Sequence, residues 1–235
     1  MWGGIAAASL LVGALISLRW KMPKPILGLT TAFGVGILIS AISFELVEKA
    51  LAVANNHYVI GGGLLVGSLV FFLGTAFIER LGHGRSTRQS STNSPFAIFI
   101  GTALDGIPES IVLGLSLING GAVSIGMLIA VFISNIPEAI AATSDLQRAK
   151  WRPKAILLLW LGTVIVSAIA AFLGFSIFDK LPVETTAFTM AFAAGALITM
   201  LADAMMPTAY RESKNLSGIA TTIGFGIAFI INRLT

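Results

Sequence analysis

Two short stretches of similar sequence, LDGIPESIVLG at residues 104–114 and ISNIPEAIAAT at residues 133–143, each place Ile-Pro-Glu inside an apolar run. Proline lacks an amide N–H and interrupts the hydrogen bonding of a helix, and a carboxylate is costly in hydrocarbon. A chain that repeats both in runs typical of membrane segments needs a chemical reason for doing so. The repeated motif therefore favours a site inside the membrane over ordinary helix packing.

The composition around these motifs is that of an integral membrane protein. Hydrophobic residues make up 56% of the 235 positions and charged residues 11%, and the mean hydropathy is +0.91. A soluble domain of this length could not bury that much apolar surface. The charges fall in short clusters between apolar runs, so residues 1–235 are expected to form a single polytopic membrane domain. There is no cysteine, which excludes disulfides and thiolate metal ligands.

The predicted fold is an all-α bundle of eight membrane-spanning helices. Runs of about 17–25 apolar residues suffice to cross a bilayer. The first run has three cations after it and none before it, which favours a membrane span over a cleaved signal peptide. The expected spans are 2–18, 26–53, 58–79, 96–118, 122–146, 155–178, 186–207 and 216–232.

The distribution of Lys and Arg predicts the orientation of the bundle. The first, third, fifth and seventh loops carry most of the 15 cations, whereas the other loops and the C-terminus hold Lys49, Lys180 and Arg233. Positive loops remain in the cytoplasm, so both termini are expected outside it. The net charge of +4 then reflects these loops and not a surface for nucleic acid. We expect a location in the plasma (inner) membrane.

The motif pair also predicts an inverted repeat. The motifs lie in the fourth and fifth spans, which must run in opposite directions. A weaker pair, FGVGILIS at 33–40 and FAAGALIT at 192–199, lies in the second and seventh spans, which are also opposed. Similar sequences on opposed helices are typical of transporters that alternate access to a site near the midplane.

The polar residues of the two motifs suit a divalent cation. Asp105 and Glu109 are four residues apart and share a helix face, as do Ser134 and Glu138, with Asn135 beside them. The proline before each glutamate leaves a backbone carbonyl without its helical donor. Carboxylate, amide and carbonyl oxygens form the kind of site that hard divalent cations prefer.

Two more acids lie along a plausible path for the cation. Glu45 is in the outer half of the second span, and Asp203 is in the inner half of the seventh, where Pro207 frees the carbonyl of Asp203. A second interpretation is that the prolines are packing kinks and the acids are protonated or paired. Acids inside membrane spans are usually functional, so we expect Glu45 and Asp203 to belong to the pathway.

This pattern resembles the ZIP family of divalent metal transporters over nearly the whole chain. That family has eight spans, outside termini and motifs of the form His-Asn-x-Pro-Glu-Gly, to which DGIPES and SNIPEA are similar. The resemblance implies a ZIP-like bundle that carries a divalent cation such as Zn, Mn, Fe, Co or Cd as its substrate. It implies neither an organic cofactor nor an enzyme activity, and it leaves a homodimer open. The implied metal ligands are Asp105, Glu109, Asn135 and Glu138, with Ser134 at the periphery.

The chain departs from the family at several ligand positions. Asp105 stands where histidine is usual, Gly106 where asparagine is usual, and Ser134 where a stronger ligand is usual. In the sixth span Ala171 and Phe172 occupy the place of a glutamate, which argues against a two-metal centre. A site without imidazole favours Mn(II), Mg(II) or Ca(II) more than nitrogen-rich sites do. We therefore expect a weaker preference for zinc than in family members that have histidine.

Other classes of protein fit the sequence less well. An intramembrane aspartyl hydrolase would need Asp105 and Asp203 close together, yet they are expected at different depths. A zinc protease is disfavoured because there is no HExxH and no histidine in any span. A proton-coupled carrier of another small cation could use the same acids and remains the alternative.

Overall fold

The computed structural model describes residues 2–54, 56–82, 106, 109, 110, 113, 114, 125–178 and 182–234, and all regular structure within these residues is helical. Two π-helical turns interrupt longer helices. The elements are α1 (Trp2–Arg19), α2 (Lys24–Ala41), η1 (Ile42–Val47), α3 (Glu48–Val53), α4 (His57–Gly82), α6 (Ile125–Arg148), α7 (Pro153–Phe178), α8 (Val183–Met200), η3 (Leu201–Met205), α9 (Met206–Ser213) and α10 (Leu216–Leu234).

Six of the expected spans are long and apolar enough to cross a membrane. Within the described ranges they are Lys24–Val53, His57–Phe77, Gly126–Arg148, Pro153–Gly174, Val183–Ser213 and Leu216–Leu234. The expected first span is a shorter apolar helix, Gly3–Arg19, and within the expected fourth span, 96–118, the described residues are 106, 109, 110, 113 and 114. The fold is thus that of a helical membrane protein.

Prolines mark where several of these helices begin. Pro23 and Pro182 are the N-terminal caps of α2 and α8, and α7 begins at Pro153. Proline is tolerated there because its missing N–H would have had no helical acceptor. At the other end, α9 stops at Lys214, whose φ of 50° is incompatible with a continuing right-handed helix.

A π-helical turn lies inside each of the second and seventh spans, and the sequence did not predict either one. At the end of η1 the amide of Glu48 donates to the carbonyl of Ser43, five residues back. At the end of η3 the amide of Met206 donates to Leu201 in the same way. Such turns are rare and frequently occur at functional sites.

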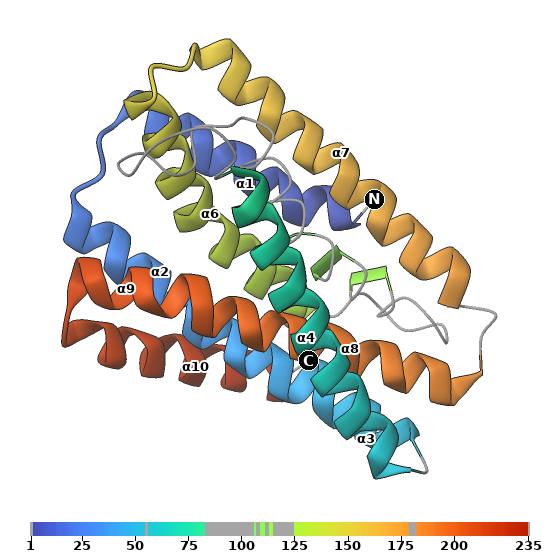
Figure 1. Ribbon diagram of the computed structural model, residues 1–235. Coiled ribbons are helices and arrows are strands. Elements are labelled where there is room, and N and C mark those ends of the chain that lie inside the picture. The colour runs from blue at the N-terminus through green and yellow to red at the C-terminus, as the bar shows by residue number, and fades with distance from the viewer. Residues whose placement is uncertain are drawn as a thin grey trace.

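The helices form two groups, as Figure 1 shows. Helices α1, α6 and α7 lie together in the upper part of the view, and α1 packs against both of the others. Helices α2, α8, α9 and α10 lie below, with α4 packed on α8. A buried apolar cluster around Trp160 lies within the first group. A larger cluster, which includes Leu38 and Leu197 of the second group, extends to Ala6 of α1 and Val131 of α6 and so joins the two groups.

Helices α2 and α10 cross in direct backbone contact. A Cβ on Gly36 would overlap the carbonyl oxygen of Thr221, and a Cβ on Gly224 would overlap that of Phe33. The hydroxyl of Thr221 donates to the carbonyl of Ala32 at 3.0 Å. Glycine is required here because no side chain fits between the two backbones.

Helices α4 and α8 cross in the same manner. A Cβ on Gly67 would overlap the carbonyl oxygen of Phe192, and a Cβ on Gly195 would overlap that of Leu64. One turn further along, the hydroxyl of Thr199 donates to Ser68 at 2.7 Å. Both crossings therefore depend on a pair of glycines, one from each helix.

Candidate functional site

The second Ile-Pro-Glu motif forms a polar face within α6. The helix continues through Pro137, so the carbonyl of Ile133 lacks its usual helical donor. The side chains of Ser134 and Asn135 are 1% and 5% exposed, and Glu138 is half-buried. Three polar side chains and a carbonyl without its helical donor therefore lie within about one turn of an apolar span.

Ser134 lies where α6 meets α2. Its hydroxyl donates to the carbonyl of Val131 at 3.1 Å. A Cβ on Gly34 of α2 would lie 3.1 Å from the Cα of Ser134, which is tighter than ordinary packing. The candidate site is thus positioned at the contact between the two groups of helices, and Gly34 provides the space for that contact.

The first Ile-Pro-Glu motif is described in part. Glu109 is 3% exposed, and its neighbour Ser110 is buried as well. A Cβ on Gly106 would lie 3.1 Å from the hydroxyl oxygen of Ser167 on α7. Asp105 lies outside the described residues. Gly106 therefore lies against α7, and Glu109 is a deeply buried acid.

Ser167 is a neighbour of the motif that the sequence did not identify. It is buried on α7, at the start of the stretch SAIAAFLG. Ala171, one turn further, is also buried, whereas Phe172 is exposed and faces away from the core. Thr163 and Ser167 are four residues apart in the apolar middle of α7, and that spacing could have identified the buried face.

Within the described residues, no three His, Cys, Asp or Glu side chains converge as a metal centre would require. Glu109 and Glu138 belong to different segments, and the third carboxylate of the predicted set, Asp105, is outside the described part of the chain. A cation at this place would therefore depend on Asp105, on the Asn135 amide oxygen or on backbone carbonyls. Such oxygen ligands are those of a hard cation site.

The two predicted pathway acids both lie in π-helical turns. Glu45, in η1, is 8% exposed, and its carboxylate accepts from the ammonium group of Lys49 at 2.5 Å and from the amide of Asn232. Asp203, in η3, is exposed and has no ion pair among the described residues. The environments of the two acids therefore differ, although both lie within membrane spans.

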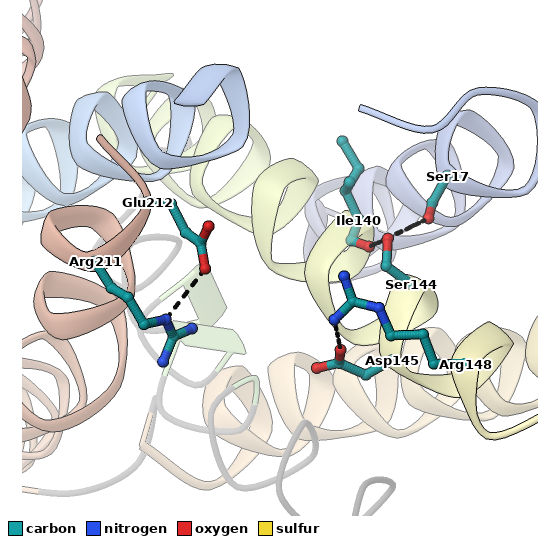
Figure 2. Close-up of polar contacts among 7 residues, drawn as sticks. All are labelled: Ser17, Ile140, Ser144, Asp145, Arg148, Arg211 and Glu212. Carbon is teal, nitrogen blue, oxygen red and sulfur yellow. Dashed lines mark hydrogen bonds and ion pairs between the residues drawn. The ribbon is translucent and has the colours of Figure 1, made fainter. Parts of the chain in front are cut away.

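Near the ends of α6 and α9, an acidic side chain forms an ion pair with a neighbouring arginine of the same helix. Figure 2 shows Asp145 beside Arg148 on α6, and Glu212 beside Arg211 on α9, each pair at 3.1 Å. In the same view the hydroxyl of Ser17 on α1 reaches the Ile140 carbonyl at 3.2 Å and Ser144 at 3.0 Å. These serine contacts join α1 to α6.

Comparison with known proteins identifies a distant relative. Over 198 residues, or 80% of this chain, the sequence is 27% identical to a provisionally named zinc transporter of Arabidopsis thaliana. The match spans 30% of that protein's length. No family model matches the chain. The chain is therefore a helical membrane protein with a distant similarity to a protein named for metal transport.

Proposed function

We propose that this protein transports divalent metal cations of the zinc, manganese and iron class across a membrane, as ZIP transporters do. The observation that carries the proposal is the buried polar face around Pro137 in α6, together with the deeply buried Glu109. Buried carboxylates in a membrane span are costly unless a cation, a proton or water compensates them. The similarity to a protein named as a zinc transporter supports a metal ion as the cation. The proposed ligands are Asp105, Glu109, Asn135 and Glu138, with Ser134 beside them.

The chemistry of these ligands supports hard cations such as Mn(II) as substrates in addition to zinc. All of the proposed donors are oxygen atoms, and no histidine lies in any expected span. Oxygen sites suit Mn(II) and similar cations, whereas imidazole nitrogen favours Zn(II) and its neighbours. We therefore include Mn(II) among the substrates, although the relative is named for zinc.

An inverted repeat of the helices is the second part of the proposal. Gly36 and Phe33 make the crossing of α2 with α10, and Gly195 and Phe192 make the crossing of α8 with α4. These residues fall at matching places in FGVGILIS and FAAGALIT. Both stretches also lead into a π-helical turn after the same number of residues. Matching crossings support two halves that share one architecture.

The directions of the helices agree with inversion. The start of α2, at Gly28, lies against Glu212 and Ser213 at the end of α9, while η1, which continues α2, packs on α8. The α2 and α8–α9 segments therefore run in opposite directions. Halves of opposite direction around a central site are the basis of alternating access. The contact of Gly34 with Ser134 is where the two groups of helices would move past each other.

Metal uptake into proteoliposomes tests the proposed site. The purified protein is compared with Glu109→Gln and Glu138→Gln for uptake of Zn, Mn, Fe, Co and Cd. Loss of a carboxylate ligand is expected to lower uptake by about tenfold or more, since even residues that only support a metal ligand have effects of that size. Glu184→Gln, at an exposed acid outside the site, is the matched control and should transport normally.

Equal uptake by all four proteins would refute the site. Uptake that follows an imposed pH gradient and does not require a metal would instead indicate a proton-coupled carrier of another cation. Binding of Zn(II) far more tightly than Mn(II) would contradict the oxygen-based preference.

A further inference from the structure

Glu45 joins two helices at one end of the second span. One carboxylate oxygen accepts from the ammonium group of Lys49 on α3 at 2.5 Å, and the other accepts from the side-chain amide of Asn232 near the end of α10. Glu45 is buried, whereas Lys49 is exposed over half of its side chain. We call Glu45, Lys49 and Asn232 the clasp. Lys49 is four residues from Glu45 on the same helical segment, so the clasp connects that segment to α10 through the bond between Glu45 and Asn232.

The rim of the clasp holds the same elements together. The guanidinium group of Arg233 lies 3.7 Å from the carboxylate of Glu48 on α3. The same group lies over the rings of Phe44 and Phe229, at 5.2 and 5.6 Å from their centres. Exposed pairs of this kind contribute little by themselves, so the buried carboxylate is the principal connection.

The corresponding end of the other half has no clasp. When the two halves are aligned on the crossing glycines, the second half has no residue like those of the clasp. Ala204 corresponds to Glu45, Thr208 to Lys49 and Thr75 to Asn232. The hydroxyl of Thr75 donates to the carbonyls of Phe71 and Phe72 in its own helix. A buried carboxylate that links helices is therefore found at one end of the proposed repeat and not at its counterpart in the described chain.

This asymmetry matters for a protein that alternates between two access states. In an inverted repeat the two states arise when the halves exchange their conformations, so identical halves would give states of equal energy. A difference in energy must come from residues that differ between the halves. A buried carboxylate that loses its partners is strongly unfavourable, because its charge is left without compensation.

We propose that the clasp is a one-sided lock, which holds α3 and the end of α10 together in the conformation seen here and opens when the protein passes to its other access state. The inference rests on the proposed alternating access. The clasp residues on α3 and α10, Lys49 and Asn232, act on Glu45 and do not bind the transported cation. Weakening either contact should open this end of the protein while the opposite end stays closed.

A single introduced thiol reports the opening, since the chain contains no cysteine. Ala50 is buried on α3 in a cluster with Ala187 and Ala191 of α8, so Ala50→Cys places a thiol between α3 and α8, where it becomes accessible when α3 moves away from its neighbours. Labelling with N-ethylmaleimide in detergent should be slow in the otherwise unsubstituted protein. We expect it to be about tenfold faster or more with Asn232→Leu or Lys49→Met, because each leaves a buried charge with one partner fewer.

Asn232→Asp provides a variant of almost unchanged size. It sets a second carboxylate beside Glu45, and like charges at this distance should accelerate the labelling at least as much as the leucine does. Ala209→Cys is the matched control, because Ala209 is a buried residue of α9 at the place that corresponds to Ala50. Its labelling should be unaffected by the clasp variants.

An unchanged labelling rate at position 50 in all three variants would overturn the lock. Equal acceleration at positions 50 and 209 would indicate general loosening and would overturn it as well. The labelling does not depend on transport. Failure of metal uptake by the unsubstituted protein would therefore reject the proposed function, whereas failure of the labelling prediction alone would reject the lock.

Discussion

Gly34 is the residue through which the contact of α2 with α6 can be tested most directly. A Cβ at this position would lie 3.1 Å from the Cα and 3.5 Å from the Cβ of Ser134. Carbon atoms pack favourably at about 3.5–4.0 Å, so alanine would require a shift of roughly half an ångström. Leucine adds three further carbons in the direction of the polar face of α6. Gly34→Leu should therefore separate the two helices at the candidate site.

The magnitude of this effect follows from packing. Extra carbons forced into a filled interface cost about 1–3 kcal/mol, which is about 5–150-fold in an equilibrium constant. Because Ser134 and Asn135 are buried at this contact, the displacement falls on the proposed ligands themselves. We expect Gly34→Leu to lower metal uptake within that range, and Gly34→Ala to have a much smaller effect.

Uptake and thermal stability should be measured together for these variants in the same preparation. Gly61→Leu is the matched control, since Gly61 is a helical glycine of α4 whose Cβ would meet nothing within 4 Å. It should retain both uptake and stability. If the Gly34→Leu protein takes up metal at the unsubstituted rate and has an unchanged melting temperature, a tight contact between α2 and α6 at the site is refuted.

Two further predictions concern the helix crossings and their hydroxyl groups. Gly36→Leu should prevent α2 and α10 from meeting and lower the yield of folded protein in detergent, whereas Gly226→Leu, with nothing within 4 Å, should be tolerated; equal yields would contradict the close crossing. Ser40→Ala should be neutral or stabilising by about 1 kcal/mol, because the Ser40 hydroxyl is buried without a hydrogen-bond partner in the described chain. Thr199→Ala should instead lower the melting temperature, because it removes the bond to Ser68, and a reversed order of the two melting temperatures would contradict this.

The expected spans that the structure describes were largely predictable, because long apolar runs have few alternatives in a membrane. Seven of the eight expected runs coincide with described apolar helices, the first of them shorter than the others. The seventh is expected at 186–207 but extends as one helical segment from Val183 to Ser213. The last turns of this segment are polar. Because hydropathy detects only apolar residues, it does not show that the helix continues past the apolar run.

The partner of Glu45 was missed for a different reason. Lys49 is four residues from Glu45, a spacing that favours an ion pair on any helix, but the count of cations assigns Lys49 to a loop. Asn232 could not have been assigned, since it approaches from a helix almost the whole chain away. Ser167 was likewise missed, because its contact with Gly106 depends on how α7 packs and not on local sequence.

The two proposed halves share the features that set their geometry and differ in those that set their energy. The crossing glycines match because backbone contact permits no side chain at either crossing. The polar partners do not match. Thr199 donates to Ser68 in one half, whereas in the other half the corresponding residues are Ser40 and Phe225, and Phe225 contacts Phe44. The clasp is the larger difference, because it involves a buried charge. Residues that differ between similar halves are therefore the ones in which a preference for one access state should reside.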